Sequence, residues 1–138
     1  MAYRIHSDGA SKGNPGPSGI GALIRDPEGK TVAEIAKYIG VTTNNVAEYT
    51  ALLEALRMCA RRKWGPVEVF ADSELLIRQL QGRYKVKHPG IIPLHAKIRE
   101  LLDQVGCVRL QHIPREENKE ADRLSNVGVE QGGASGID

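Results

Sequence analysis

Four acidic residues stand at positions where their carboxylates could form one site; they are Asp8, Glu48, Asp72 and Asp122. Asp8 and Asp72 each lie at the end of a predicted strand. If these two strands pair in parallel, the two carboxylates lie side by side at strand ends, where the ligand sites of open α/β sheets are found. The joint placement of the acids therefore favours a shared carboxylate site.

Each acid also has an ordinary structural explanation. Any single one of the 17 acidic residues is most often a solvated surface group. Asn45 and Glu48 have the spacing of a capping box, and Asp72 could cap the helix that follows it. Asp8 could begin a turn, and Asp122 could be an exposed helical residue. Only the joint placement of the four argues against these explanations.

The elements that position the acids follow from the spacing of apolar residues. Alternating and β-branched residues predict three antiparallel strands at Tyr3–Asp8, Gly19–Arg25 and Thr31–Ile39. Apolar residues three and four positions apart predict a first helix that begins at Asn45 and ends before Gly65. The remaining predicted elements are a strand at Val67–Ala71, a helix from Ser73 to about Gln81, a basic loop at Arg83–Pro89, a helix at Ile92–Val105, a strand at Cys107–Ile113 and a last helix capped by Asn118. The order β-β-β-α-β-α-α-β-α predicts an α/β fold.

Composition places the chain among ordinary globular proteins. Its 138 residues fit one domain, predicted for residues 1–130, followed by a flexible glycine-rich tail at residues 131–138. No signal peptide or transmembrane run is visible, so no membrane association is expected. Net charge is only +2, which leaves nucleic-acid binding open.

The two cysteines, Cys59 and Cys107, lie far apart in the sequence. Cys59 falls on the apolar side of a helical pattern, which predicts a buried free thiol in a reducing, cytoplasmic setting. Neither the cysteines nor the four scattered histidines show the paired spacing of a structural zinc site.

Four sequence blocks that contain the acids resemble the type 1 ribonuclease H family, in the family's order. The blocks are Ser7–Pro17, Thr42–Glu48, Ala71–Ser73 and Pro114–Asp122, and the resemblance covers Tyr3 to about Val129. It implies a ribonuclease H-like fold, with a five-stranded mixed sheet of three antiparallel strands plus two parallel strands, flanked by helices. It also implies an endoribonuclease that hydrolyses the RNA strand of RNA–DNA hybrids and leaves 5′-phosphate and 3′-hydroxyl ends.

The same resemblance implies that Asp8, Glu48, Asp72 and Asp122 hold two Mg²⁺ ions, with Mn²⁺ as the alternative metal. Oxygen ligands suit a hard cation, and carboxylates held close together repel one another without one. By resemblance, Asp8 bridges both ions and Asp122 completes the site that activates water. Glu48 and Asp72 complete the site on the leaving-group side.

By resemblance, three asparagines read the RNA strand. Asn14, Asn44 and Asn45 are expected along the minor groove, where amides contact 2′-hydroxyls, the groups that distinguish RNA from DNA. Glu48 is also expected to reach a 2′-hydroxyl, and Thr43 to contact a DNA phosphate. Asn44 and Asn45 could equally serve as helix caps.

The predicted basic loop departs from some family members, which carry a basic protrusion between the second and third helices. The chain leaves little room for a protrusion there. Arg83, Lys85 and Lys87 are expected to replace it in part by contacting phosphates. A short basic loop that is only solvated is the alternative.

The family often has a histidine on a mobile loop before the last acid, and His112 lies near that place. Its neighbours Leu110, Gln111 and Ile113 indicate instead that it belongs to the last strand. A structural histidine is the commoner outcome. His112 is therefore a candidate catalytic residue, with Arg115 as the alternative loop residue.

Two other functions compete with a free hybrid nuclease. A 3′–5′ exonuclease of the same broad fold usually carries Asp-x-Glu on the first strand, whereas Gly9 and Ala10 follow Asp8. A non-catalytic nucleic-acid-binding module would be expected to lack an acid, and all four are present. A domain cut from a reverse transcriptase would need sequence beyond this chain. We therefore expect a free enzyme, a monomer, whose partner is an RNA–DNA hybrid.

Overall fold

The computed structural model describes residues 1–135. The strands are β1 (Tyr3–Ser11), β2 (Gly16–Arg25), β3 (Thr31–Thr42), β4 (Val67–Ala71) and β5 (Cys107–His112), and the helices are α1 (Asn44–Arg62), α2 (Glu74–Leu80), α3 (Ile92–Val105), the short 3₁₀ helix η1 (Arg115–Glu117) and α4 (Lys119–Ser135). Apart from η1, this is the predicted order. None of the helices within residues 1–135 combines the length and the apolarity that crossing a membrane requires.

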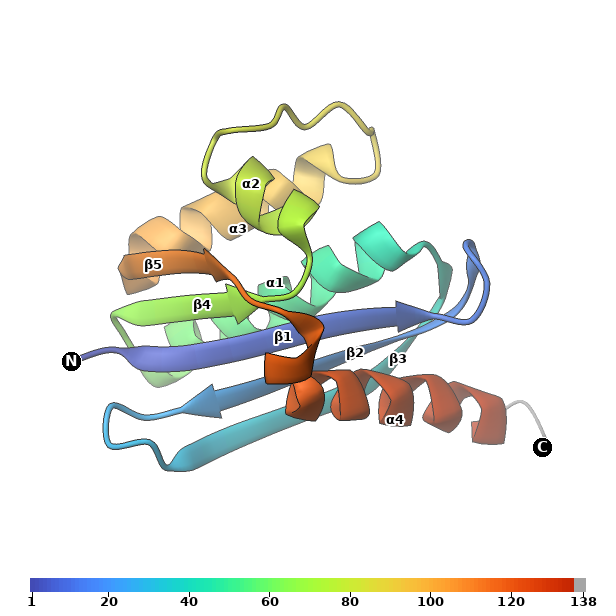
Figure 1. Ribbon diagram of the computed structural model, residues 1–138, viewed down its shortest axis with the longest axis horizontal. Helices are drawn as coiled ribbons and strands as arrows, with labels where there is room; N and C mark the ends of the chain where they lie inside the picture. The colour runs from blue at the N-terminus through green and yellow to red at the C-terminus, as the bar shows by residue number, and fades with distance from the viewer. Residues whose placement is uncertain (136–138) are drawn as a thin grey trace.

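The five strands form one mixed sheet in the order β3-β2-β1-β4-β5 (Figure 1). Strands β1, β2 and β3 pair antiparallel, and β4 pairs parallel with both β1 and β5. This arrangement confirms the predicted sheet of three antiparallel strands plus two parallel strands. In the parallel pair at its centre, Ser7 of β1 lies opposite Ala71 of β4.

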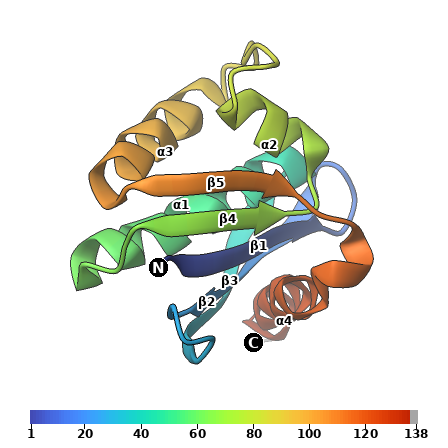
Figure 2. The same cartoon turned by 60° about the vertical axis from the view of Figure 1, so that its left-hand side comes forward.

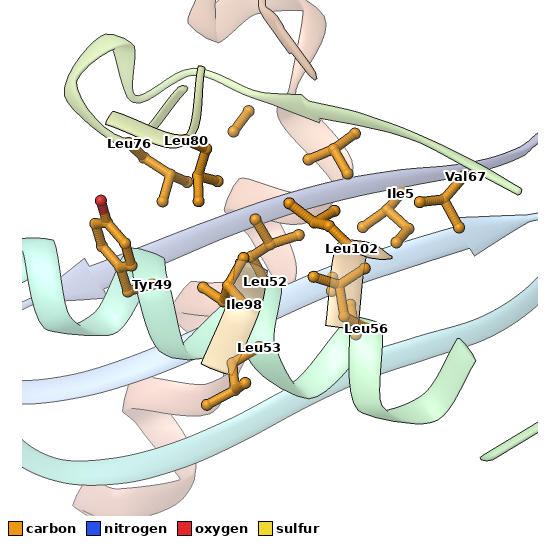
Figure 3. Close-up of a cluster of buried hydrophobic side chains, with 14 of the residues drawn as sticks. Ile5, Tyr49, Leu52, Leu53, Leu56, Val67, Leu76, Leu80, Ile98 and Leu102 are labelled. Carbon is orange, nitrogen blue, oxygen red and sulfur yellow. The ribbon is translucent and has the colours of Figure 1, made fainter. Parts of the chain in front are cut away.

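Helices cover both faces of the sheet (Figure 2). Helix α1 packs on β1 and β2 with α3 against it, and α4 packs on β1, β2 and β3 from the other face. The main core lies between α1, α3 and the sheet, where Tyr49, Leu52 and Leu56 of α1 are fully buried at the predicted helical spacing (Figure 3). Burying each such side chain contributes about 1.5–3 kcal/mol to folding. Cys59 belongs to this core and is free, as predicted.

Strands β1, β2 and β3 all extend further than predicted, because the start of β2 pairs with the ends of both β1 and β3. Ser11 lies opposite Ser18, and Gly16 lies opposite Thr42. The hydroxyls of Ser11 and Ser18 both donate to the Thr42 carbonyl, at 3.0 and 3.2 Å. These bonds hold the end of β3, and therefore the start of α1, beside the end of β1.

Helix α4 runs to Ser135, so the predicted tail begins as helix; residues 136–138 lie outside the described residues. Gly132 explains why packing overrides the poor helix propensity of the glycine-rich segment. A side chain at Gly132 would collide with the Tyr38 ring of β3. The glycine therefore allows the last turns of α4 to lie directly on the sheet.

Candidate active site

One polar pocket brings the four predicted acids together. Its lining includes Asp8 from β1, Glu48 from α1, Asp72 from the end of β4 and Asp122 from α4. The other lining residues are Gly9, Ala10, Ser11, Asn44, Arg115 and Asn126. Acids that lie up to 114 positions apart in the sequence (8 to 122) thus share one site.

The parallel pairing of β1 with β4 positions the first two acids. The parallel pairing ends with Ser7 opposite Ala71, so Asp8 and Asp72 are the first residues beyond it and lie next to each other; β4 ends there, whereas β1 continues to Ser11. Asp8 is only 8% exposed. The side-by-side placement of the two acids is the one the sequence predicted, but the predicted end of the first strand at Asp8 is wrong, because β1 continues to Ser11 by pairing with β2.

Close packing of β1 on α1 positions Glu48. A β-carbon added to Gly9 would lie 2.4 Å from the main chain of both Ala47 and Glu48. Only glycine therefore allows the strand to approach the first turn of α1 so closely. The residue after Asp8 is small because the backbone of the next acid lies against it.

Asn118 positions Asp122. It occupies the residue before α4, and its carbonyl accepts a hydrogen bond of 3.0 Å from the Asp122 N–H, but within residues 1–135 its side-chain oxygen has no hydrogen-bond partner, so the predicted side-chain cap does not form. Its side-chain amide instead donates to the Ser7 carbonyl, at 3.0 Å. The first turn of α4 is thereby held against β1 beside Asp8.

The carboxylates disturb one another's ionisation. Burial raises the pKa of Asp8 to about 8, helped by the charge of Asp72, a hydrogen bond with Asp122 and the charge of Glu48; the N–H of Gly9 opposes the shift. Burial also raises the pKa of Glu48 to about 7, and a hydrogen bond with Ser73 opposes it. Near neutral pH, the pocket therefore favours an added positive charge, whether protons or a cation.

The donor set of the pocket fits a hard divalent cation. Carboxylate oxygens are the ligands that Mg²⁺ prefers. Glu48 Oε2 is buried without a hydrogen-bond partner, so it is an oxygen with a free ligand position. In residues 1–135, no three Asp, Glu, His or Cys side chains are grouped closely enough to hold an ion by themselves. Water or substrate oxygens would have to complete the coordination, as is usual for Mg²⁺.

Of the two loop candidates, Arg115 lies at the pocket. Its guanidinium lies 3.7 Å from Asp122 Oδ1, and its side chain is 78% exposed. His112 is the exposed last residue of β5, opposite Ala71, and is not among the lining residues. The assignment of His112 to the last strand is confirmed, and its catalytic role stays a prediction.

The first helix is capped by Thr43, so the predicted capping box of Asn45 and Glu48 is wrong. Helix α1 begins at Asn44, and the Thr43 side chain accepts a hydrogen bond of 3.2 Å from Val46 N–H. Strand β3 continues to Thr42, which leaves Thr43 as the extended residue that a cap requires. The cap therefore lies one residue before Asn44 and two residues before Asn45.

The structure places only some of the predicted asparagines at the pocket. Asn44 lines the pocket, and its N–H donates to Asn14 Oδ1 at 3.2 Å, which ties the β1–β2 turn to the start of α1. Asn45 is exposed outside the lining. Their contacts with RNA, and that of Thr43 with a phosphate, stay predictions.

Arg83, Lys85 and Lys87 are all exposed on the loop between α2 and α3, which projects beyond both helices in Figure 1. None of the three lines the acidic pocket. Any contact they make with a substrate must therefore lie away from the reacting phosphate.

Sequence reasoning missed Asn126, which lines the pocket. Its side-chain amide donates to the Asp122 carbonyl at 2.9 Å. A signal was present, because residues four apart share one face of a helix. Any polar residue four positions after a site acid on a helix is a candidate for the same site.

The chain is similar to a known family model, to curated relatives and to solved structures. A family model described as "Reverse transcriptase-like" matches residues 6–128. Bifunctional protein Rv2228c of Mycobacterium tuberculosis is 39% identical over 94% of this chain, which spans only 36% of that relative's length. Ribonuclease H of Chlorobium phaeovibrioides is 35% identical, with 91% of this chain and 93% of the relative covered. The crystal structure of LC11-RNase H1 in complex with RNA/DNA hybrid matches with a TM-score of 0.87 and 46% identity, over 94% of this chain and 98% of that one.

Proposed function

Because the chain belongs to the ribonuclease H family, we propose that it is an endoribonuclease that hydrolyses the RNA strand of RNA–DNA hybrids, leaving 5′-phosphate and 3′-hydroxyl ends. The observation that carries the proposal is the meeting of Asp8, Glu48, Asp72 and Asp122 in one pocket. The hybrid complex of LC11-RNase H1, at 46% identity, supports the choice of substrate.

The four acids would hold two Mg²⁺ ions, with Mn²⁺ as the alternative. When bound, a pair of divalent cations polarises the phosphate and makes a water more acidic, which is the chemistry that an in-line displacement needs. Burial makes Asp8 and Glu48 favour protonation in the free protein, and they would release these protons to the solvent when cations bind. By resemblance, Asp8 serves both ions.

Amide side chains beside the acids would orient the RNA strand. Asn44 lines the pocket and is tied to Asn14 of the neighbouring turn, so the two present adjacent polar groups. Asn45 follows Asn44 in the first turn of α1 and is exposed. We assign the three to 2′-hydroxyl and base-edge contacts, which would separate RNA from DNA. Thr43 is assigned to a DNA phosphate.

Arg115 is the better candidate for a cationic group at the reacting phosphate. It lies in the pocket lining and pairs with Asp122 in the free protein. A guanidinium can transfer from a carboxylate to a phosphate, because both present matched oxygen acceptors. His112 stays the second candidate, since its strand ends beside that of Asp72.

We also propose that the protein is a monomer that works in the reducing environment of the cytoplasm. Free thiols support this setting: Cys59 is buried in the core and Cys107 is exposed, and neither forms a disulfide.

A cleavage assay tests the proposed function. Labelled RNA–DNA hybrid is compared with matched single-stranded RNA, duplex DNA and duplex RNA, in Mg²⁺ and in chelator. We expect Mg²⁺-dependent cutting of the hybrid's RNA strand, and its loss in Asp8→Asn. Asp103→Asn, which changes an exposed acid outside the pocket, is the matched control and should cut normally. Cutting in chelator, or equal cutting of all four substrates, would contradict the proposal.

A further inference from the structure

We infer that Gln79 is a positioning residue that holds the basic loop (Arg83–Pro89) at a fixed place relative to the acidic pocket, so that its cations meet hybrid phosphates. The inference rests on the proposed function. It assigns a positioning role in substrate binding to a side chain of α2 that is not among the residues lining the acidic pocket.

The side chain of Gln79 bridges the first helix to the loop. The hydroxyl of Tyr49 donates to Gln79 Oε1, and Gln79 Nε2 donates to the Lys85 carbonyl at 3.1 Å. Tyr49 is only 1% exposed and directly follows Glu48 on α1. In Figure 3 its hydroxyl points out of the core at the end where Leu76 of α2 lies. One amide thus connects the helix of a site acid to the middle of the basic loop.

The main chain of Gln79 adds two further anchors. Its carbonyl lies 3.3 Å from His95 Nε2 of α3 and accepts a bond of 3.1 Å from Gly82 N–H. The Tyr49 and His95 rings are also neighbours, with centroids 6.5 Å apart. Gln79 therefore lies where α1, α2, α3 and the loop meet, and a shift of its side chain would move the loop against α1.

The loop backbone is tied down on both sides of Lys85, whereas its cations are exposed. Arg83 N–H donates to the Arg78 carbonyl at 2.8 Å, and Val86 packs half-buried against the core. At the far end, the His88 carbonyl accepts from the N–H groups of Ile91 and Ile92, at 2.9 and 3.0 Å, where α3 begins. The Lys85 carbonyl lies between these anchors, and among the hydrogen bonds of the described residues Gln79 Nε2 is its side-chain donor.

A fixed loop strengthens phosphate binding without adding a contact. Binding pays for ordering whatever is mobile in the free protein, so a loop already held in place loses less on meeting the substrate. The chemical step takes place at the acids, which the loop does not touch. Loss of the bridge should therefore weaken hybrid binding and leave the rate of the bound complex unchanged.

Three variants isolate the bridge. Gln79→Met keeps the length of the side chain and removes both of its hydrogen bonds, without a change of charge. Tyr49→Phe removes the other half of the bridge and serves as an independent second variant. Gln81→Met is the matched control, because Gln81 Nε2 donates to Leu110 of β5, at 2.8 Å, and not to the loop.

Two measurements read the effect. Hybrid affinity is measured by fluorescence anisotropy with each change placed in an Asp8→Asn background, and KM and kcat are measured on the active protein, both across a series of salt concentrations. We expect Gln79→Met and Tyr49→Phe each to raise Kd and KM about fivefold with kcat within twofold, and to make the salt dependence shallower by about one phosphate contact. The double variant should bind the hybrid no more weakly than either single variant, because both substitutions break the same bridge.

Unchanged Kd, KM and salt slope in both variants, with hybrid cutting intact in the parent, would overturn the inference and spare the proposed function. An equal rise in Gln81→Met would also overturn it, since the effect would then be general loosening of α2. A parent protein that neither binds nor cuts hybrid would overturn both. A fall in kcat without a rise in KM would place Gln79 in a different role and overturn the inference as well.

Discussion

The side-chain amide of Asn118 donates to the main-chain carbonyl of Ser7 at 3.0 Å, which joins two residues 111 positions apart in the sequence. Ser7 precedes Asp8, and the Asn118 carbonyl accepts from Asp122 N–H at 3.0 Å. Asn118 is 1% exposed, so the bond is shielded from water. One buried asparagine thus links the strand of the first acid to the helix of the last.

We expect Asn118→Ala to lower both stability and activity. Losing a buried hydrogen bond and leaving its partner unpaired costs about 1–3 kcal/mol. Urea unfolding should show that loss, and hybrid cutting should fall at least tenfold under conditions where the variant is fully folded, because Asp122 is no longer held beside Asp8. Asn126→Ala is the stability control, since the hydrogen bond of its side chain among residues 1–135 lies within α4, and its free energy of unfolding should stay within about 0.5 kcal/mol of the parent. If Asn118→Ala cuts the hybrid as fast as the parent, the hydrogen bond between Asn118 and Ser7 is not needed to position Asp122 beside Asp8.

The sequence could predict what depends on local pattern, and it could not predict what depends on contacts between distant residues. Alternating and helical spacing predicted the element order, and the expected parallel pairing of the strands that carry Asp8 and Asp72 predicted the position of the site, although β1 continues to Ser11. The length of α4 could not be predicted, because it depends on Gly132 lying against the Tyr38 ring. The role of Asn118 was hidden for the same reason: a cap residue was recognisable, but its partner Ser7 was not.

The raised pKa values of two acids predict how metal-free stability varies with pH. A carboxyl whose folded pKa lies above its unfolded value binds protons more tightly when folded, so it lowers stability as the pH rises between the two values. For Asp8 this interval runs from 3.8 to about 8, and for Glu48 from 4.5 to about 7. In chelator, the contribution of these two groups should therefore be unfavourable at pH 8 and absent near pH 3.5.

Asp8→Asn tests this linkage. The variant should be more stable than the parent at pH 8 by at least about 1.4 kcal/mol, the equivalent of one pKa unit, and should lose that advantage as the pH falls toward 4. Urea unfolding at several pH values in chelator measures it, with Asp103→Asn as the exposed control. An advantage that is the same at every pH would rule out the raised pKa of Asp8 as its source.

Mg²⁺ should stabilise the folded protein through the same acids. A ligand that binds only the folded state raises the unfolding free energy, by about 2.7 kcal/mol at a hundred times its Kd. Thermal unfolding should therefore shift upward with added Mg²⁺ in the parent, and much less in Asp8→Asn or Glu48→Gln. The shift should shrink below pH 7, because protons then compete for Asp8 and Glu48. Equal shifts in parent and variants would place the bound Mg²⁺ elsewhere.

The three cations of the basic loop should contribute to the salt dependence of substrate binding. Replacing Arg83, Lys85 and Lys87 by Gln should raise KM and reduce the slope of log KM against log salt by about 0.7–0.9 for each phosphate that the loop no longer neutralises. The control removes the same charge at the end of α1, with Arg61, Arg62 and Lys63 replaced by Gln; these residues are also exposed, and their slope should match the parent. Identical slopes for the two triple variants would mean that the loop cations are only solvated.

Substitutions of Arg115 and His112 should show which of the two is the cationic group near Asp122. Arg115 lines the pocket and lies 3.7 Å from Asp122, whereas His112 is exposed at the end of β5 outside the lining. Arg115→Ala should lower kcat by at least about tenfold. This loss should be smaller than the loss on removing a fully buried electrostatic group, because Arg115 is largely exposed. Arg115→Lys should recover part of the loss of kcat, and the kcat of His112→Ala should stay within threefold of the parent value. A larger loss of kcat in His112→Ala than in Arg115→Ala would reverse this assignment.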